Sequence, residues 1–129
     1  MPGSYLLDTN AVIARRAGDE LLEALFTRDD HLLVSVVTAG ELIFGALRSG
    51  RVEANLAALS AYIQPENVLV CDLATARHYG EVKRQLRSIG RPVPDNDTWI
   101  AATAIQHDLV LVTRDAHFDH IEGLTCLSW

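Results

Sequence analysis

Residues 95–104 have the sequence DNDTWIAATA, and the chain is organised around this stretch. Two acids follow Pro94 and lead into a run of small and apolar residues, which predicts a helix with Asp95 as its N-cap. Three positions on the face that begins with Asp97 are apolar, so this face is expected to pack against a core. They are Ile100, Ala101 and Ala104. A carboxylate at the tip of such a face either favours the helix dipole or belongs to a functional site.

Length and composition bound the class of protein. The chain has 129 residues, 49% hydrophobic content and a net charge of -6, which predicts one globular domain over residues 1–129. No apolar run has the length of a membrane span, and the N-terminus lacks a signal-peptide pattern, so a cytoplasmic protein is expected. The acidic net charge argues against a protein that binds nucleic acid nonspecifically over its whole surface, but it is compatible with a local basic surface. Cys71 and Cys126 lie in short apolar runs and are expected to be buried thiols.

Apolar runs alternate with helical patterns along the chain. Strands are predicted at residues 5–8, 31–35, 68–71 and 109–113, with a short last strand at 124–128. Helices are predicted at residues 12–16, 19–28, 38–48, 52–63, 73–89 and 95–107. This alternation predicts a three-layer α/β/α fold with a mostly parallel sheet of four or five strands.

Four acids are expected at one edge of this sheet. Asp8 ends the first strand, Asp115 follows the fourth, and Glu41 lies in the first turn of the helix after the second strand. The helix that begins near Asp97 leads into the fourth strand, so it runs antiparallel to that strand and begins at the same edge. Ligands of parallel sheets bind outside the carboxyl ends of the strands, which is where the four acids meet.

Carboxylates that lie close together repel one another unless some are protonated or a cation neutralises them. Two charges about 4 Å apart repel by roughly 4 kcal/mol at an effective dielectric near 20. Oxygen ligands without a convergent set of histidines or cysteines select Mg²⁺ or Mn²⁺. Such ions typically serve phosphate chemistry, in which they activate water and offset charge on the phosphoryl oxygens. The four acids are therefore predicted to be metal ligands and catalytic residues.

Each residue also has a simpler explanation. Asp8 fits an N-cap, and Thr9 and Asn10 fit either polar support for Asp8 or alternative caps. Asp115 fits a turn residue, and Thr113 fits an ordinary threonine at a strand end. The argument for function is the convergence of the acids.

Glu41 has a structural alternative of its own. It completes Thr38-x-x-Glu41, which is a capping-box pattern. Gly45, one turn later, favours function because it removes bulk beside the Glu41 side chain, although a packing glycine is an alternative.

These residues resemble those of the PIN-domain ribonucleases, and within them the VapC-type toxins of bacterial toxin–antitoxin pairs. The motifs are LDTN (7–10), TAGEL (38–42) with Gly45, DTWIAATA (97–104) and LVTRD (111–115), the last continuing into His117-Phe118. They occur in the family's order and cover essentially the whole chain. The resemblance implies an endoribonuclease that depends on Mg²⁺ or Mn²⁺. It makes Asp8, Glu41, Asp97 and Asp115 the acidic quartet, with Thr9 and Thr113 as polar support.

The resemblance also implies partners, namely an RNA substrate, a cognate antitoxin with a tail across the acidic groove, and a second copy in a homodimer. Exposed candidates for the dimer contact are Ile43, Phe44 and Leu47, with core packing as the alternative. Arginines outnumber the single lysine, Lys83, and five of them are candidates for RNA contact, with a solvated face as the alternative. These are Arg15, Arg16, Arg48, Arg84 and Arg87.

Three other functions fit parts of the pattern. A receiver-type phosphorylation domain shares the fold class, but it needs a lysine at the sheet edge, and Lys83 is expected to lie in a remote helix. A metal-free ribonuclease would use His117 and His120 as acid and base. A non-catalytic module would bind RNA or protein without using the acids.

Overall fold

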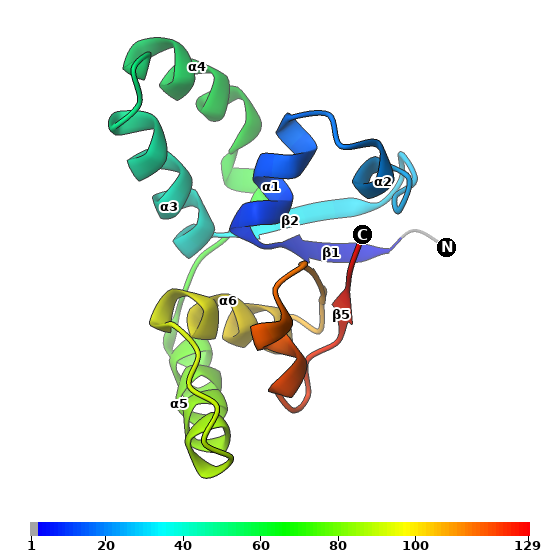
Figure 1. Cartoon of the computed structure of the whole chain (residues 1–129), viewed down its shortest axis with the longest axis vertical. Coiled ribbons are helices and arrows are strands. Elements are labelled where there is room, and N and C mark those ends of the chain that lie inside the picture. Colours follow the sequence, from blue (N-terminus) through cyan, green and yellow to red (C-terminus); the bar gives the residue numbers. More distant parts are fainter. Residues whose placement is uncertain (1–2) are drawn as a thin grey trace.

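The computed structural model describes residues 3–129, and residues 1 and 2 of the predicted domain lie outside the described part (Figure 1). The strands are β1 (Ser4–Leu7), β2 (His31–Ser35), β3 (Val68–Leu69), β4 (Val110–Val112) and β5 (Cys126–Leu127). The helices are α1 (Thr9–Arg16), α2 (Glu20–Glu23), α3 (Val36–Leu47), α4 (Val52–Tyr62), α5 (Leu73–Ser88) and α6 (Asp95–Gln106). Two 3-10 turns are η1 (Pro65–Asn67) and η2 (Ala116–His120). Across residues 3–129, no helix combines the length and apolar character that crossing a membrane requires.

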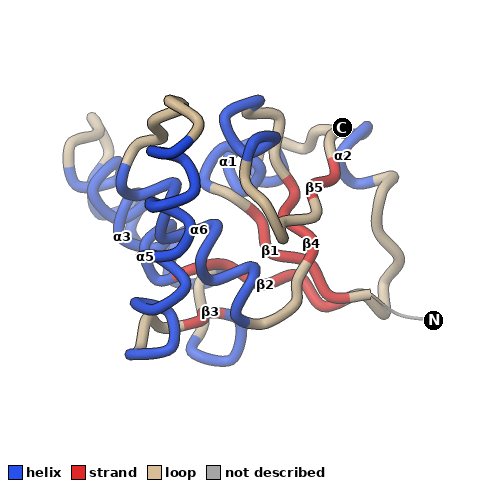
Figure 2. The backbone as a smooth tube through the Cα atoms, turned by 90° about the horizontal axis from the view of Figure 1, so that it is seen from below, coloured by secondary structure: helices blue, strands red, loops and turns tan. Residues whose placement is uncertain are grey.

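The five strands form one sheet in the order β3-β2-β1-β4-β5, and every pair is parallel (Figure 2). Leu7 at the end of β1 is in register with Val34 of β2 and Val112 of β4. The carboxyl ends of the three central strands therefore meet at one edge. The predicted mostly parallel sheet is confirmed, with the larger of the two expected strand numbers.

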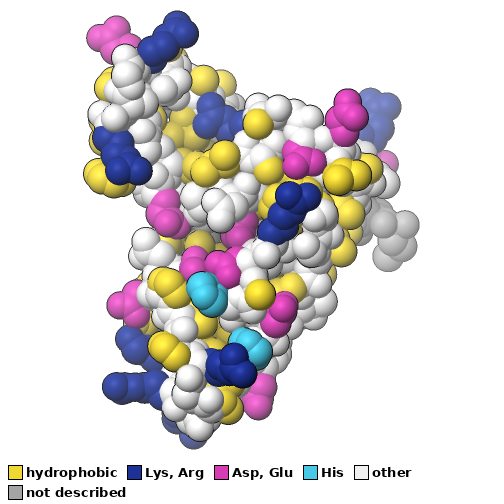
Figure 3. Space-filling model, in the orientation of Figure 1, with side chains coloured by type: hydrophobic (Ala, Val, Ile, Leu, Met, Phe, Trp, Pro, Cys, Tyr) yellow, Lys and Arg dark blue, Asp and Glu magenta, His cyan; other side chains and the backbone are white. Residues whose placement is uncertain are grey.

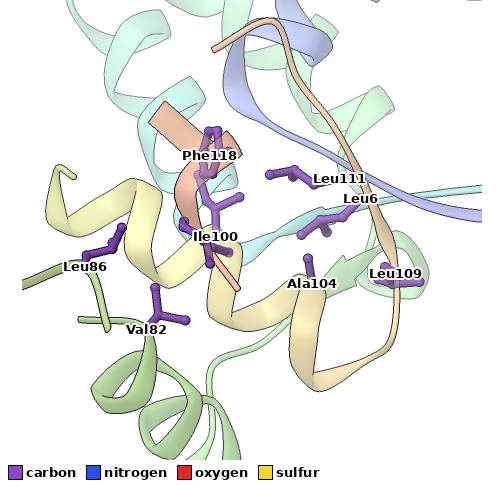
Figure 4. Close-up of a cluster of buried hydrophobic side chains, with 10 residues drawn as sticks. Leu6, Val82, Leu86, Ile100, Ala104, Leu109, Leu111 and Phe118 are labelled. Atoms are coloured by element: carbon purple, nitrogen blue, oxygen red, sulfur yellow. The ribbon is translucent and has the colours of Figure 1, made fainter. Parts of the chain in front are cut away.

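Two hydrophobic cores cover the two faces of the sheet. Leu6 and Leu111 pack with α5, α6 and η2 on one face (Figure 4). Leu7 and Val112 pack with α1 to α4 on the other. Successive residues of a strand point to opposite faces of the sheet. Because these strands are apolar on both faces, helices must cover both sides of the sheet. This explains the three layers.

Helix α6 carries the predicted buried face, but its cap differs from the prediction. Ile100 and Ala101 are buried as expected. Pro94 occupies the N-cap position, and Asp95 is the first helical residue. The Asp95 carboxylate instead accepts hydrogen bonds from Lys83 and Tyr79 of α5. The predicted N-cap role of Asp95 is therefore wrong, because a partner on the adjacent helix draws its side chain away from the helix end.

Helix α3 begins two residues earlier than predicted. Ser35 is its N-cap and accepts a hydrogen bond from the Val37 amide at 3.0 Å. Thr38 is consequently a buried helical residue, and the predicted Thr38–Glu41 capping box does not form. Glu41 lies in the second turn rather than the first.

Three smaller predictions are also wrong. The predicted helix at 19–28 is only the four-residue α2, because the chain then turns at Asp30, whose carboxylate accepts from the amides of Thr27 and Gly3. Strand β3 ends at Leu69, since only two of its residues pair with β2. Cys71 follows this short strand and is exposed, whereas Cys126 in β5 is half-buried.

The close approach of α6 to the sheet makes a first prediction. Ala104 has no exposed surface and packs with Leu6 and Leu109. Ala104→Leu should destabilise the fold by about 1–3 kcal/mol, because a tightly packed interior has no space for the added carbons. Ala57→Leu, at an exposed position of α4, should change stability by less than about 0.5 kcal/mol. Urea unfolding measures both, and equal effects would contradict the tight packing of α6.

Candidate functional site

The carboxyl edge of the sheet positions three acids at the beginnings of helical segments. Asp8 is the N-cap of α1 and accepts from the Ala11 amide at 2.7 Å. Asp115 is the N-cap of η2, three residues after the end of β4. Asp97 lies in the first turn of α6, which begins at this edge and runs back toward β4. The N-cap alternative for Asp8 is therefore correct, but it leaves a second carboxylate oxygen for another role.

The Thr113 hydroxyl connects two of these acids. It donates to Asp8 Oδ2 at 2.5 Å in a buried hydrogen bond between the ends of β1 and β4. It also accepts from the Asp115 amide at 3.0 Å. Both hydroxyl functions are used, so Thr113 fixes the Asp8 carboxylate relative to the turn that carries Asp115. Its geometry agrees with the predicted polar support.

Glu41 is held by the other predicted threonine. The Thr9 hydroxyl lies 2.8 Å from Glu41 Oε1 and 3.3 Å from the Thr38 hydroxyl. Thr9 follows Asp8 directly, so this contact brings the Glu41 carboxylate of α3 towards the same edge.

A histidine joins the acids at the closest part of the site. One potential ligand atom from each of Asp97, Asp115 and His117 lies within 4.8 Å of the others. The His117 Nδ1 is 3.0 Å from Asp115 Oδ1. The sequence placed His117 in the family motif and in a metal-free mechanism, but did not predict it beside the metal ligands. The signal was the Asp-x-His spacing directly after a strand.

The electrostatics indicate mutual repulsion. The pKa of Asp97 is raised to about 6, mainly by desolvation and then by the other acids of the site. These acids are Asp115, Glu41 and Asp8, in decreasing order of effect, whereas His117 acts in the opposite direction. The pKa of Asp8 is also raised, chiefly because burial outweighs the hydrogen bonds from Thr113 and Ala11. Acids that raise one another's pKa form one electrostatic unit.

The donor set suits a divalent cation. Figure 3 shows acidic side chains and a histidine close together between the part of the molecule with α3 and α4 and the part with α5 and α6. Carboxylate oxygens suit Mg²⁺ and Mn²⁺, and an imidazole nitrogen is a further ligand for Mn²⁺. A cation between the acids would reverse the repulsion that raises the pKa of Asp97.

Two predicted contributors to this site play no visible part in it. Asn10 is exposed on α1, and its side chain makes no hydrogen bond within residues 3–129. Asp8 caps the helix and Thr9 contacts Glu41, so polar support from Asn10 stays a prediction. A Cβ placed on Gly45 would meet no atom within 4 Å, so relief of crowding beside Glu41 does not explain this glycine.

Lys83 lies closer to the site than predicted. Its ammonium is 3.0 Å from Asp95 Oδ1 and 3.2 Å from the Tyr79 hydroxyl, and Tyr79 stacks on Trp99. Asp95 is two residues from Asp97, so Lys83 is not remote from the carboxyl edge. Its charge is nevertheless paired with Asp95.

The candidate arginines fall into different environments. Arg15 is tied to Glu23 at 3.2 Å and to the Tyr62 hydroxyl at 3.0 Å. Arg84 pairs with Glu81 on α5, and Arg87 is exposed on the same helix. Arg16 and Arg48 line a groove of about 550 Å³ that also includes Thr9 and Glu41. Arg16 and Arg48 are therefore the two arginines that share a groove with the acidic site.

A family model described as the PIN domain matches residues 5–124. This range includes all four predicted acids, and the parallel sheet with acids at its carboxyl edge agrees with the match. The chain therefore belongs to the PIN-domain family. This finding decides against the receiver-type alternative.

Within this family, the matching relatives and solved structures include VapC and VapBC proteins. The tRNA(fMet)-specific endonuclease VapC of Shigella flexneri is 33% identical over 128 residues, which cover 97% of each chain. DNA-bound VapBC from Salmonella typhimurium has a TM-score of 0.87 at 32% identity, covering 100% of this chain and 99% of the other. VapBC-5 from Mycobacterium tuberculosis, a member of the VapBC family of toxin–antitoxin systems, has a TM-score of 0.77 at 31% identity, with 98% of each chain covered.

The raised pKa of Asp97 makes a prediction for the metal-free protein. A carboxyl whose pKa is higher in the folded than in the unfolded state stabilises the fold below about pH 4, and this contribution is lost as the pH rises through about 6. Asp97→Asn removes the penalty, so its melting temperature should match that of the wild type near pH 4 and exceed it by roughly 2–5 °C at pH 7.5. Thermal unfolding in EDTA measures the difference.

The same measurement with excess Mg²⁺ serves as the control. The cation should stabilise the wild type and reduce the advantage of Asp97→Asn, because the variant has lost a ligand. A variant that is less stable than the wild type at pH 7.5 in EDTA would contradict the repulsive environment of Asp97.

Proposed function

We propose that this protein is a single-domain VapC-type endoribonuclease that hydrolyses RNA phosphodiester bonds with Mg²⁺ or Mn²⁺. As the toxin of a toxin–antitoxin pair it would act in the cytoplasm and block translation. One observation carries the proposal, namely the convergence of Asp97, Asp115 and His117 within 4.8 Å at the carboxyl edge of a PIN-domain sheet.

The acidic quartet is proposed to hold the metal. Its members are Asp8, Glu41, Asp97 and Asp115. When bound, a divalent ion supplies activation of the attacking water and compensation of charge on the phosphoryl oxygens. The expected products carry a 5′-phosphate and a 3′-hydroxyl, as the family resemblance implies.

The protein's own contribution is to hold these carboxylates ready before any ligand binds. Asp8 is buried and receives two hydrogen bonds, so its orientation is fixed. Thr113 transmits this orientation to Asp115, and Thr9 holds Glu41. Such preorganisation lowers the cost of assembling charged groups during the reaction.

A cognate antitoxin is the proposed protein partner. The groove of about 550 Å³ begins at Thr9 and Glu41 and extends along α1 and α3 to Arg48. Exposed Phe44 and Ile13 give it an apolar surface. A peptide tail lying in this groove would cover the approach to the acids, and it would thereby block RNA.

A homodimer is proposed as well. Ile43 and Leu47 are four residues apart on α3, and their side chains are 42% and 54% exposed. Residues with this spacing share one face of a helix, and an exposed apolar face gains stability when a second copy covers it. Phe44, the third candidate, lies in the groove instead.

Cleavage assays test the metal-dependent mechanism. Asp97→Asn should reduce RNA cleavage by at least about 10²-fold, a loss expected when an essential electrostatic group is removed, while circular dichroism stays unchanged. Asp95→Asn is the matched control on the same helical turn, and it should retain nearly full activity because Asp95 pairs with Lys83. Sequencing of the cleaved ends should identify 5′-phosphates.

The same assay in excess EDTA separates the alternatives. Loss of cleavage supports the metal mechanism, whereas persistent cleavage would favour His117 and His120 as a metal-free acid and base. Retention of wild-type cleavage by Asp97→Asn would overturn the assignment. An effect in cells that survives this substitution would favour a non-catalytic binding module.

Of the candidate arginines, Arg16 and Arg48 are proposed to contact RNA first, because they line the groove beside the acids. In the Asp97→Asn background, which binds without cutting, Arg16→Ala or Arg48→Ala should weaken binding of total transfer RNA about three- to tenfold. Each substitution should also reduce, by about one, the slope of the logarithm of the binding constant against the logarithm of the salt concentration. Arg15→Ala is the control, because Glu23 and Tyr62 already occupy its guanidinium. Equal losses in all three variants would contradict the groove as the RNA path.

A further inference from the structure

His117 lies beside the proposed metal ligands, although the acidic quartet does not include it. Its Nδ1 is 3.0 Å from Asp115 Oδ1, and a ring nitrogen lies within 4.8 Å of both Asp97 and Asp115 ligand atoms. The imidazole therefore has the same two neighbours that a cation between these acids would have.

The spacing of these atoms fits an octahedral metal site. Ligand atoms about 2.1 Å from a metal ion and at right angles to each other are about 3.0 Å apart, and opposite ligands are about 4.2 Å apart. The contact between His117 and Asp115 has the first of these separations. All three potential ligand atoms lie within 4.8 Å of one another, which is close to the second of these separations.

A hydrogen bond from Nδ1–H is the other explanation of this contact, because a carboxylate oxygen can accept more than one donor. Asp115 Oδ1 already accepts the backbone amide of His117 at 2.9 Å, which satisfies the capping role of this oxygen. The imidazole places a second nitrogen, Nδ1, against the same Asp115 oxygen. Two lone-pair atoms brought together in this way repel unless a proton or a cation lies between them.

The turn that carries His117 is fixed at both ends. Asp115 caps η2 at its start, and the buried Phe118 anchors its middle in the core. At its end, the His120 carbonyl accepts from Gln85 Nε2 at 2.9 Å. The His117 side chain itself is 59% exposed, so the ring can rotate into position while its backbone stays in place.

We infer that His117 is a further ligand of the divalent ion, and that its ring nitrogen makes the site prefer Mn²⁺ to Mg²⁺. This inference rests on the proposed metal-dependent function. Both ions favour oxygen ligands, but Mg²⁺ gives up its waters reluctantly, whereas Mn²⁺ is a transition-metal ion and accepts an imidazole nitrogen more readily than Mg²⁺ does. A neutral imidazole completes the coordination without adding another negative charge to the acids that already repel one another.

The alternative role for His117 is that of a positioning residue. Its Nδ1–H would then donate to Asp115 and orient the carboxylate without touching the metal. Loss of such a contact weakens Mg²⁺ and Mn²⁺ binding alike, because the same carboxylate serves both ions. Loss of a nitrogen ligand affects Mn²⁺ more strongly, so the ratio of the two affinities distinguishes the roles.

Metal titration of the full chain, without RNA, tests the inference. Isothermal titration with MnCl₂ alone and with MgCl₂ alone is applied to the wild type, His117→Ala and His120→Ala. His117→Ala should weaken Mn²⁺ binding by about tenfold or more, the scale on which even outer partners of a ligand act, and Mg²⁺ binding by less than about threefold. His120→Ala is the matched control from the same turn, and it should change neither.

Pulsed electron paramagnetic resonance of the Mn²⁺-loaded protein gives a second measurement. Coupling to a ¹⁴N nucleus should be present in the wild type and in His120→Ala, and absent in His117→Ala. Absence of this coupling in the wild type, or an equal loss of both affinities in His117→Ala, would overturn the assignment as a ligand. In that case RNA cleavage that still requires a divalent ion leaves the proposed function intact, whereas cleavage in EDTA overturns both.

Discussion

The hydroxyl of Thr113 donates to Asp8 across the ends of two adjacent strands and accepts from the amide of Asp115. The acids of this edge repel one another, so they remain in place only where the fold supplies fixed donors. The hydrogen bond to Asp8 is buried, and a buried group that loses its partner carries its own full desolvation cost. The remaining geometry of the edge depends on this contact, because it links the end of β1 to the turn that carries Asp115 and His117.

Two cores hold the edge rigid from below. One core joins β1 and β4 to α5, α6 and η2, and the other joins them to α1 to α4. Asp97 enters the site because α6 packs closely on the first core, while Glu41 enters because α3 packs on the second. The acidic site thus lies where both layers meet the sheet, and the repulsion within it is balanced by packing energy elsewhere. The raised pKa of Asp97 reflects burial and this repulsion, and a bound cation would reduce the repulsion.

Most of the fold and much of the candidate site could be predicted from sequence. The alternation of apolar runs with helical patterns predicted the parallel sheet. The position of Asp8 and Asp115 after strands, and of Glu41 and Asp97 near the starts of helices, predicted the shared edge. Helix ends were less predictable, because caps depend on which partner lies nearby. Asp95 has the composition of an N-cap, yet Lys83 on α5 binds its carboxylate. Ser35 rather than Thr38 caps α3, and the choice is set by where β2 ends.

The sequence by itself determined the order of strands and helices along the chain and the edge of the sheet at which the acids lie, because side-chain periodicity and parallel connections obey local rules. Only the tertiary structure decided which side chains touch. Thr113 serves Asp8, Thr9 serves Glu41, and His117 joins Asp97 and Asp115. These contacts join residues as far as 105 positions apart. They depend on the packing of whole layers and on rotamer directions, which no local pattern in the chain specifies.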